Sequence, residues 1–183
     1  RFLNIIPVPR VYTNSMDVND YPVLVKPDRG HGSQGIRIVS NFQELTRAID
    51  NVPDAIICEY LPGDEYTIDC FSSMKHGLQF AGARKRTRMR NGISVNTATE
   101  NLAEAWDYAT AISRTLSLRG AWFFQLKRNT TGTLTLLEIA PRIAGAMAAH
   151  RVTGVNFPML SILEQEDAEI QIVTNPGQVV MDR

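Results

Sequence analysis

The chain has 183 residues, 44% of them hydrophobic, which suits one domain, or one compact domain of two lobes, with a real core. Nineteen basic residues balance nineteen acidic ones, so no overall field favours nucleic acid or an anionic membrane. No apolar run approaches the ~20 residues of a membrane-spanning helix and no secretory signal is visible, so a cytoplasmic protein is expected. Cys58 and Cys70 lie in apolar runs, which favours buried, reduced thiols over a disulfide or a metal pair.

Hydrophobic periodicity and turn residues divide the chain into short strands and a few helices. In chain order the predicted elements are strands at 10–14, 23–26 and 36–39, a helix at 42–50, strands at 55–60, 65–73 and 78–86, a helix of about 16 residues opening at Thr99, strands at 121–128 and 133–140, a helix at 157–166 and a strand at 168–174. Many neighbouring strands are joined by short turns, which predicts the α+β class with mostly antiparallel sheets rather than a doubly wound parallel sheet.

A lysine and a glycine-rich loop follow the second predicted strand. Gly30, Gly32 and Gly35 permit a closely approached backbone whose N–H groups can wrap a phosphate chain. The stretch is not a dinucleotide fingerprint, because no helix follows it, and not a Walker loop, because Lys26 precedes the glycines. A snorkelling lysine and a plain hairpin connection are the alternatives, but the seven residues 29–35 exceed what a turn requires. We therefore expect a nucleotide site here.

Three segments stand in a characteristic order: Lys26 before the glycine loop, C-E-Y-L-P-G-D-E-Y at 58–66, and L-E-I-A-P-R at 137–142. Together they resemble the ATP-grasp superfamily, and most closely its carbamoyl-phosphate-synthetase-like branch of carboxylate–amine ligases. The resemblance covers roughly residues 10–160. It implies two α+β lobes that clasp ATP, the small lobe at 1–61 and the large lobe at 62–183. Family members usually carry a further N-terminal domain, which is expected to be missing from this chain.

The resemblance assigns the phosphates of ATP to the first segment. Lys26 is expected to meet the α-phosphate and the adenine edge. The loop is expected to close over the β- and γ-phosphates and to exclude water, with contacts from His31, Gly32, Ser33 and Gly35.

The second segment is expected to hold adenine and ribose. Glu59, Tyr60 and Leu61 span the join between the lobes, where the backbone of Glu59 and Leu61 would bind adenine. Glu65 would accept the ribose hydroxyls by resemblance. On spacing alone, a solvated strand carboxylate is an equally good interpretation of Glu65.

Gln125 and Glu138 lie on adjacent predicted strands and can face one cleft. Glu138 has aliphatic neighbours on both sides, and a carboxylate buried among them would need a cation or a donor. Mg²⁺, with Mn²⁺ as an alternative, takes such oxygen ligands together with phosphates. The resemblance implies that Glu138 bridges Mg²⁺ ions and that Gln125 is a second metal residue; an ordinary amide on a half-wet strand is the alternative for Gln125.

The third segment departs from the family pattern E-x-N-P-R, because Ala140 stands where the family has a metal-binding asparagine. Three alternatives follow for the missing asparagine ligand. Water or another side chain supplies it, one metal ion binds weakly, or the activity is impaired. Arg142 is retained and is expected to meet the γ-phosphate or the acyl phosphate as a bidentate donor.

The basic run at 84–90 is a candidate for the neighbourhood of the phosphates and the acceptor carboxylate, with Arg86 and Arg88 as the catalytic candidates. A solvated basic face is the alternative. The run lacks the interleaved aromatic residues that stack on bases, so nucleic acid is not expected as a partner.

By resemblance, the γ-phosphate of ATP passes to a small carboxylate to give an acyl phosphate, which an amine (or a thiol) then attacks. A homodimer formed through the rest of the full-length protein is a further expectation. A nucleotide-binding module without ligase activity is the main alternative, because of Ala140. An ATP-grasp kinase acting on another acceptor is the next, and a basic nucleic-acid-binding domain ranks last.

Overall fold

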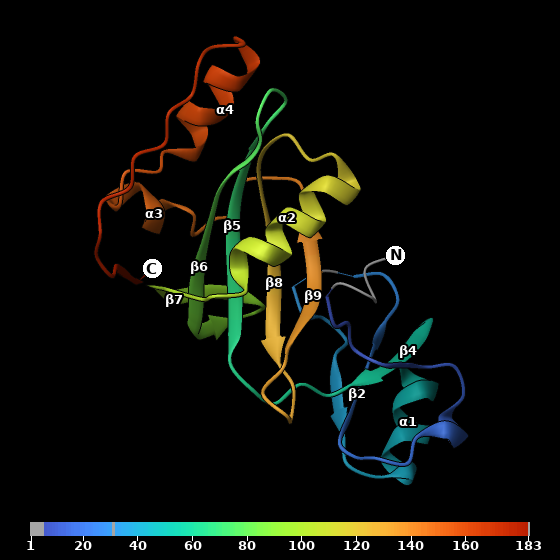
Figure 1. Ribbon diagram of the computed structural model, residues 1–183. Coiled ribbons are helices and arrows are strands. Elements are labelled where there is room, and N and C mark those ends of the chain that lie inside the picture. The colour runs from blue at the N-terminus through green and yellow to red at the C-terminus, as the bar shows by residue number, and fades with distance from the viewer. Residues whose placement is uncertain (1–5, 31, 183) are drawn as a thin grey trace.

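Two antiparallel sheets organise the protein in the computed structural model, which describes residues 6–30 and 32–182 (Figure 1). The small sheet has the strand order β1-β4-β2-β3 and the large sheet the order β10-β7-β6-β5-β8-β9. The strands are β1 (Val11–Tyr12), β2 (Val23–Pro27), β3 (Arg37–Val39), β4 (Ala55–Glu59), β5 (Glu65–Ser73), β6 (Gly77–Arg90), β7 (Ile93–Glu100), β8 (Gly120–Arg128), β9 (Leu134–Ala140) and β10 (Val180–Asp182). The helices are α1 (Phe42–Asn51), α2 (Ala105–Leu116), α3 (Ala148–Val152) and α4 (Phe157–Gln165). The predicted α+β class with antiparallel sheets is confirmed.

The small sheet buries one face against α1. Val23 and Val25 of β2 and Leu45 of α1 are at most 1% exposed in one apolar cluster. α1 begins where the sequence predicts, because Asn41 Oδ1 accepts a hydrogen bond from the Glu44 N–H at 2.9 Å, which is half of a capping box.

The large sheet has two unlike faces. On the core face, Ile68 of β5 and Trp122 and Phe124 of β8 pack with Ile112 of α2, and all four are fully buried. α2 lies across this face (Figure 1). The alternate side chains point to the opposite face, the cleft face.

The cleft face is divided into an apolar part and a polar part. In the apolar part, Phe71 and Phe123 of the sheet pack with Met147 and with Phe157 of α4, so α4 and the segment leading into α3 cover it. The polar part begins where this cover ends, and it holds the candidate functional residues.

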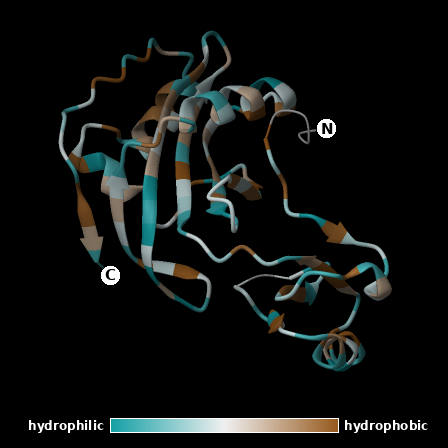
Figure 2. Cartoon of the chain, turned by 60° about the horizontal axis from the view of Figure 1, so that its bottom comes forward, coloured by the Kyte–Doolittle hydropathy of each residue, from teal (hydrophilic) through white to brown (hydrophobic). Residues whose placement is uncertain are grey.

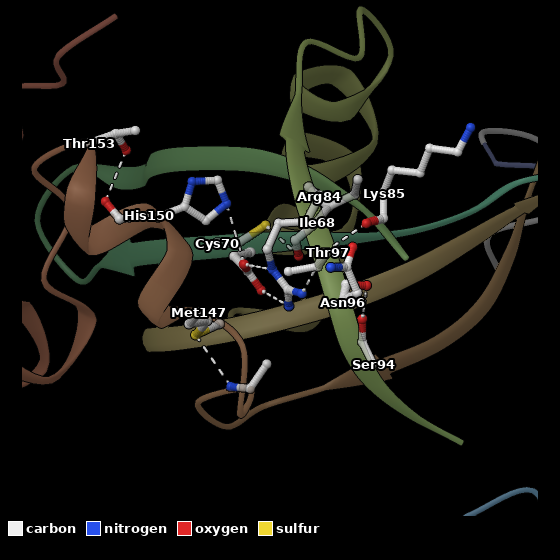
Figure 3. Close-up of polar contacts among 12 residues, drawn as sticks. Ile68, Cys70, Arg84, Lys85, Ser94, Asn96, Thr97, Met147, His150 and Thr153 are labelled. Atoms are coloured by element: carbon white, nitrogen blue, oxygen red, sulfur yellow. Dashed lines mark hydrogen bonds and ion pairs between the residues drawn. The ribbon is translucent and has the colours of Figure 1, made fainter. Parts of the chain in front are cut away.

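A buried ion pair lies between the two parts (Figure 3). Arg84 Nε and Nη2 donate to the Asp69 carboxylate at 2.5 and 3.0 Å, and the two residues are 1% and 0% exposed. Thr97 Oγ1 accepts from Arg84 Nη1 at 3.5 Å. His150 Nε2 lies 3.3 Å from Asp69 Oδ2 without hydrogen-bond geometry. The bidentate geometry offsets part of the cost of burying two charges.

β7 is the main departure from the predicted elements. The prediction of a helix opening at Thr99 is wrong, because β7 runs to Glu100 and α2 begins only at Ala105. Asn91 and Gly92, with φ of +51° and +74°, form the tight hairpin turn between β6 and β7 that the sequence analysis overlooked.

The predicted strand at 168–174 is also wrong. Within the described residues this segment has no strand partner, although Ile170 and Ile172 pack against the apolar part of the cleft face. The alternation of apolar residues in this segment therefore reflects contact with α4 and the large sheet rather than pairing with a neighbouring strand. Among the described residues, no helix combines the length and the apolar character needed to cross a bilayer.

The Arg84–Asp69 pair allows a stability test. We expect Arg84→Met to lower the free energy of unfolding by about 3–5 kcal/mol, because it leaves the buried Asp69 carboxylate without its cation. Lys75→Met is the matched control: it removes a pair with Asp167 whose side chains are 56% and 77% exposed, and about 0–1 kcal/mol is expected. Urea denaturation measures both, and equal effects of the two substitutions would contradict the prediction.

Candidate functional site

A row of polar side chains crosses the polar part of the cleft face. Gln125 of β8 lies opposite Thr67 of β5 on one side and Glu138 of β9 on the other. Glu65, at the start of β5, lies opposite Lys127. Residues directly opposite each other in neighbouring strands point to the same face. The register therefore brings predicted site residues from three separate sequence segments together.

Arg86 of β6 joins the members of this row. Its Nη1 donates to Gln125 Oε1 at 2.8 Å and to Glu65 Oε1, and its Nη2 donates to the backbone carbonyl of Gly92 at 2.5 Å. Lys127 Nζ lies 3.5 Å from the other oxygen of Glu65. The Arg86 side chain is 5% exposed, yet its Nε has no partner among the described residues. A buried donor without a partner costs about 1–3 kcal/mol, so a ligand acceptor would be favourable here.

A β-bulge at Leu137 sets the direction of Glu138. Gln125 pairs with Glu138, and the next pair along the ladder skips Leu137. Leu136 can thus enter the core face while Glu138 turns to the cleft face; without the extra residue the two side chains would share a face.

The expectation that Glu138 is buried among its aliphatic neighbours is wrong. The side chain is exposed, because those neighbours point elsewhere, and it forms no ion pair or hydrogen bond within the described residues. Because the Glu138 side chain is exposed, the cost of burying a carboxylate is no argument for a metal ion here. Its position beside Gln125 still leaves the carboxylate free to contact a ligand.

Ala140 is the last residue of β9, and Arg142 follows just beyond the end of the strand. The Arg142 guanidinium lies 4.9 Å from the centre of the Phe123 ring and is exposed to solvent. Ala140, which pairs with Phe123, packs its methyl group against the apolar cluster of the cleft face. This position offers no metal ligand.

Arg88 points away from the row. The β6–β7 ladder skips Thr87, so Arg86 and Arg88 face opposite sides of the sheet. Arg88 forms an exposed pair with Asp182 of β10 at 2.6 Å. Of the two arginines that the sequence analysis selected, the structure brings only Arg86 to Glu65 and Gln125.

Most cations of the basic run form ion pairs within the chain. The pairs are Arg84 with Asp69, Lys85 with Asp64, Arg86 with Glu65 and Arg88 with Asp182. The Asp64 hydrogen bond raises the pKa of Lys85. The run is therefore a set of cross-strand ion pairs rather than a free stripe of positive charge.

The small sheet contributes Lys26 on the face opposite its α1 cluster. Lys26 pairs with Ile56, and alternation places it on the same face as Leu24 and Cys58. Lys26 has no ion pair or hydrogen bond within the described residues. An unpaired ammonium beside an apolar strand face suits a ligand that is both anionic and aromatic.

The segment that connects the two sheets begins directly after β4. The Glu59 N–H donates to the Arg10 carbonyl at 2.8 Å, and Glu59 Oε2 accepts from the Arg10 N–H at 3.2 Å. Tyr60 is half-buried and Leu61 is 4% exposed. The Glu59 side chain thus binds the Arg10 backbone, and the Leu61 side chain is buried. The predicted adenine contacts would come from the backbone of this segment.

Gly32 and Ser33 of the glycine loop lie against the β6–β7 turn of the large sheet; Figure 2 shows the cartoon from this end of the molecule, with hydrophobic residues in brown. Gly32, Ser33 and Gly35 have φ of +61°, +58° and +73°, which agrees with the predicted need for a special backbone. Ser33 lies next to Gly92 in the β6–β7 turn. The predicted contact from His31 lies outside the described residues.

The donor set fits a Mg²⁺ ion that arrives with phosphates better than a closed protein cage. Within the described residues no group of three or more His, Cys, Asp or Glu side chains could hold a metal. Glu138 and Gln125 offer one carboxylate and one amide oxygen, and Mg²⁺ is commonly held by one or two carboxylates plus substrate phosphates. Arg86 already donates to the Gln125 oxygen, so Glu138 is the stronger candidate ligand.

Sequence reasoning missed Lys127, and it missed the link from Arg86 to the β6–β7 turn. Lys127 stands two residues after Gln125 in β8, and residues two apart in a strand point to the same face. The sequence pattern would therefore have placed Lys127 beside Gln125. The Asn91–Gly92 pair was a hairpin signal in the sequence.

Cys58 reports on Lys26. Burial raises the pKa of the Cys58 thiol above its ordinary 9.0, and the Lys26 ammonium offsets part of that rise. We expect Lys26→Met to slow alkylation of Cys58 by iodoacetamide several-fold between pH 7 and 9, because less thiolate is present. Mass spectrometry measures the rate, and fully buried Cys70, whose pKa is raised further, is the unreactive internal reference. An equal or faster rate in Lys26→Met would contradict this electrostatic link.

Comparisons with known proteins show which family and which fold the chain shares. The family described as "ATP-grasp in the biosynthetic pathway with Ter operon" matches residues 51–181. The carbamoyl phosphate synthase large chain of Clostridium beijerinckii is 26% identical over 161 residues, covering 79% of this chain and 15% of that protein.

Solved structures share the fold. The biotin carboxylase domain of the Hydrogenobacter thermophilus 2-oxoglutarate carboxylase, in complex with MgADP, ADP and bicarbonate, has a TM-score of 0.78 at 18% identity, covering 96% of this chain and 46% of that chain. N5-carboxyaminoimidazole synthetase from Staphylococcus aureus, complexed with ADP, has a TM-score of 0.77 at 17% identity, covering 97% of this chain and 52% of that chain.

This chain therefore spans about half the length of these structures and 15% of the curated relative. The two structural likenesses establish the fold, whereas the match over residues 51–181 establishes the family. The chain belongs to the ATP-grasp family of the biosynthetic pathway with the Ter operon.

Proposed function

We propose that this chain forms the nucleotide-binding part of an ATP-dependent ligase that joins a small carboxylate to an amine or a thiol through an acyl phosphate. The observation that carries the proposal is the row of Glu65, Arg86, Gln125 and Glu138 on the cleft face. The relatives from Hydrogenobacter and Staphylococcus carry MgADP or ADP in their structures, which supports a nucleotide as the ligand.

The charges of the site favour a polyphosphate. The candidate residues comprise four cations, which are Lys26, Arg86, Lys127 and Arg142, and two carboxylates, Glu65 and Glu138, so their formal sum is +2. Electrostatic stabilisation of developing charge is usually the largest contribution to phosphoryl transfer, because the reaction needs little covalent help from the protein.

The proposed reaction has two steps. A carboxylate oxygen of the substrate attacks the γ-phosphorus, the bond to the β,γ-bridging oxygen breaks, and ADP leaves. The amine lone pair then attacks the acyl carbon, loses a proton, and expels inorganic phosphate. Arg142, exposed at the end of the row, would hold the acyl phosphate through two parallel N–H donors.

Nucleotide positions follow from the two sheets. Lys26 would neutralise the α-phosphate while the apolar face around it contacts adenine. Glu65 would accept the ribose hydroxyls, and residues 32–35 would cover the outer phosphates. Mg²⁺, or Mn²⁺ in its place, would be held by Glu138 with help from Gln125 and would neutralise phosphate charge.

A nucleotide-binding module without ligase activity is the second candidate. Ala140 supplies no second metal ligand, and Arg86 already occupies the Gln125 oxygen. ATP binding without Mg²⁺-dependent ADP release by the full-length protein, in a screen against amino acids and small carboxylates, would favour this module. A phosphorylated product without amide formation would identify a kinase.

Glu138→Ala tests the chemistry. Because the side chain is exposed and unpaired, its loss is expected to change the free energy of unfolding by less than about 0.5 kcal/mol. ATP turnover by the full-length protein should fall by at least ~100-fold, since removal of one stabilising group from a transition state commonly costs that much. Glu166→Ala, which removes another exposed carboxylate, is the control. Full activity in Glu138→Ala would exclude the assignment.

Glu65→Ala tests the ribose contact. Hydrogen bonds to a charged group are worth about 1.5–3 kcal/mol, so ATP affinity measured by calorimetry should weaken by about ten- to a hundredfold. Affinity for inorganic tripolyphosphate, which has no ribose, should not fall, because the variant leaves Arg86 and Lys127 as free cations. Unchanged ATP affinity, or an equal loss for tripolyphosphate, would show that Glu65 does not bind the ribose.

A further inference from the structure

The turn between β6 and β7 makes a close backbone contact with the glycine loop. A Cβ on Gly92 would lie 2.8 Å from Ser33 Oγ and 3.1 Å from the carbonyl carbon of Gly32. A Cβ on Gly32 would in turn lie 3.6 Å from the Asn91 carbonyl oxygen. Any larger residue at position 92 would push against the Ser33 hydroxyl and the Gly32 backbone, so glycine there lets the turn and the loop approach this closely. The contact joins a loop of the small sheet to a hairpin of the large sheet.

Arg86 forms a hydrogen bond to the same turn. Its Nη2 donates to the Gly92 carbonyl at 2.5 Å, while Nη1 donates to Glu65 and to Gln125. The guanidinium is rigid and planar, and its donors point in fixed directions, so these bonds are made by one body. A displacement of Glu65 therefore acts on the turn, and a displacement of the turn acts on Glu65.

We propose that Arg86 and the Asn91–Gly92 turn form a mechanical coupling between the ribose position and the glycine loop. Engagement of Glu65 by a ribose shifts the balance of hydrogen bonds around Arg86, which repositions the turn and seats residues 32–35 over the phosphates. The proposal rests on the proposed function for the identity of the ligand. Arg86 is thus a positioning residue, distinct from groups that touch the reacting atoms.

The coupling is reciprocal by thermodynamic necessity. If nucleotide binding seats the loop, then seating the loop strengthens nucleotide binding by the same factor. A ligand without ribose hydroxyls should seat the loop less well than ATP, even when it fills the phosphate positions. Lysine at position 86 would keep the charge but lose the fixed fork, so it should weaken the coupling as well as the binding.

The test compares two glycines in the two hairpin turns of β6. Gly92 and Gly77 have φ of +74° and +69°, so alanine carries a similar backbone strain at either position. A Cβ on Gly77 meets nothing within 4 Å, whereas a Cβ on Gly92 meets the glycine loop. Gly77→Ala is therefore the matched control for Gly92→Ala, and any difference between them comes from the loop contact.

Loop seating is measured by the rate of trypsin cleavage after Arg29, followed by mass spectrometry on the full chain, without ligand and with saturating ATP. We expect Gly92→Ala to be cleaved at least fivefold faster than Gly77→Ala without ligand, and to lose most of the protection that ATP gives to wild type. ATP affinity should fall about tenfold in Gly92→Ala only. Ser33→Gly in the Gly92→Ala background should restore part of the protection, because it removes the Oγ that the new methyl meets.

The outcomes separate the coupling from the proposed function. If wild type binds ATP and Gly92→Ala matches Gly77→Ala in cleavage and affinity, the coupling is overturned while nucleotide binding stands. If wild type binds no ATP but Gly92→Ala still exposes Arg29, the loop contact stands and the nucleotide assignment fails. Failure of Ser33→Gly to restore any protection would show that the Ser33 hydroxyl is not the group that the new methyl displaces, and would leave only the Gly32 backbone contact to explain a difference between Gly92→Ala and Gly77→Ala.

Discussion

The Asp69–Arg84 ion pair is the constraint on which the layout of the large sheet depends. A bidentate pair that is almost completely buried cannot be moved without leaving a charge unpaired, so it fixes the register of β5 against β6. On one side of the pair the sheet is covered by α4 and the segment around α3, and its side chains are apolar. On the other side the same strands continue with the charged side chains of Glu65 and Arg86, which pair with each other. The Asp69–Arg84 pair therefore marks the boundary between an apolar part and a polar part of a single face.

Two interruptions of regular pairing decide which side chains reach that surface. An extra residue at Leu137 sends Glu138 to the cleft face, and an extra residue at Thr87 sends Arg88 away from it. Strict alternation places every second residue of a strand on the same face. A strand that contributes to a core on one face and to a site on the other can need an extra residue that shifts the alternation by one position. A bulge provides this at the cost of one unpaired residue. Both bulges lie next to the polar row, in positions typical of bulges beside functional sites.

Local patterns in the sequence predicted much of this architecture. Alternation gave β5 its bounds at Glu65 and Ser73, and the capping box at Asn41 located the start of α1. Long-range pairing was harder to predict: β7 is stable as a strand because it lies between β6 and β10, and neither neighbour is visible from its own residues. The exposure of Glu138 was not predicted for the same reason, since the bulge that separates its side chain from those of its aliphatic neighbours depends on the partner strand. The β6 bulge decides that Arg86, and not Arg88, meets Glu65. The positions of the charges along the run do not reveal this bulge.

Ala140 shows how such a fold can change its chemistry without changing its shape. The residue sits where the cleft face passes from apolar to polar, and its methyl group contacts the cluster that includes Phe123. An amide there would add a polar group at the edge of the cleft, whereas the methyl group extends the packed region by one position toward the cleft. The border between core and site is thus a matter of single side chains, and on β9 it lies at Ala140, the last residue of the strand. Selection on such border positions can exchange catalytic groups for packing, or the reverse, while the strands, their register and the buried ion pair stay in place.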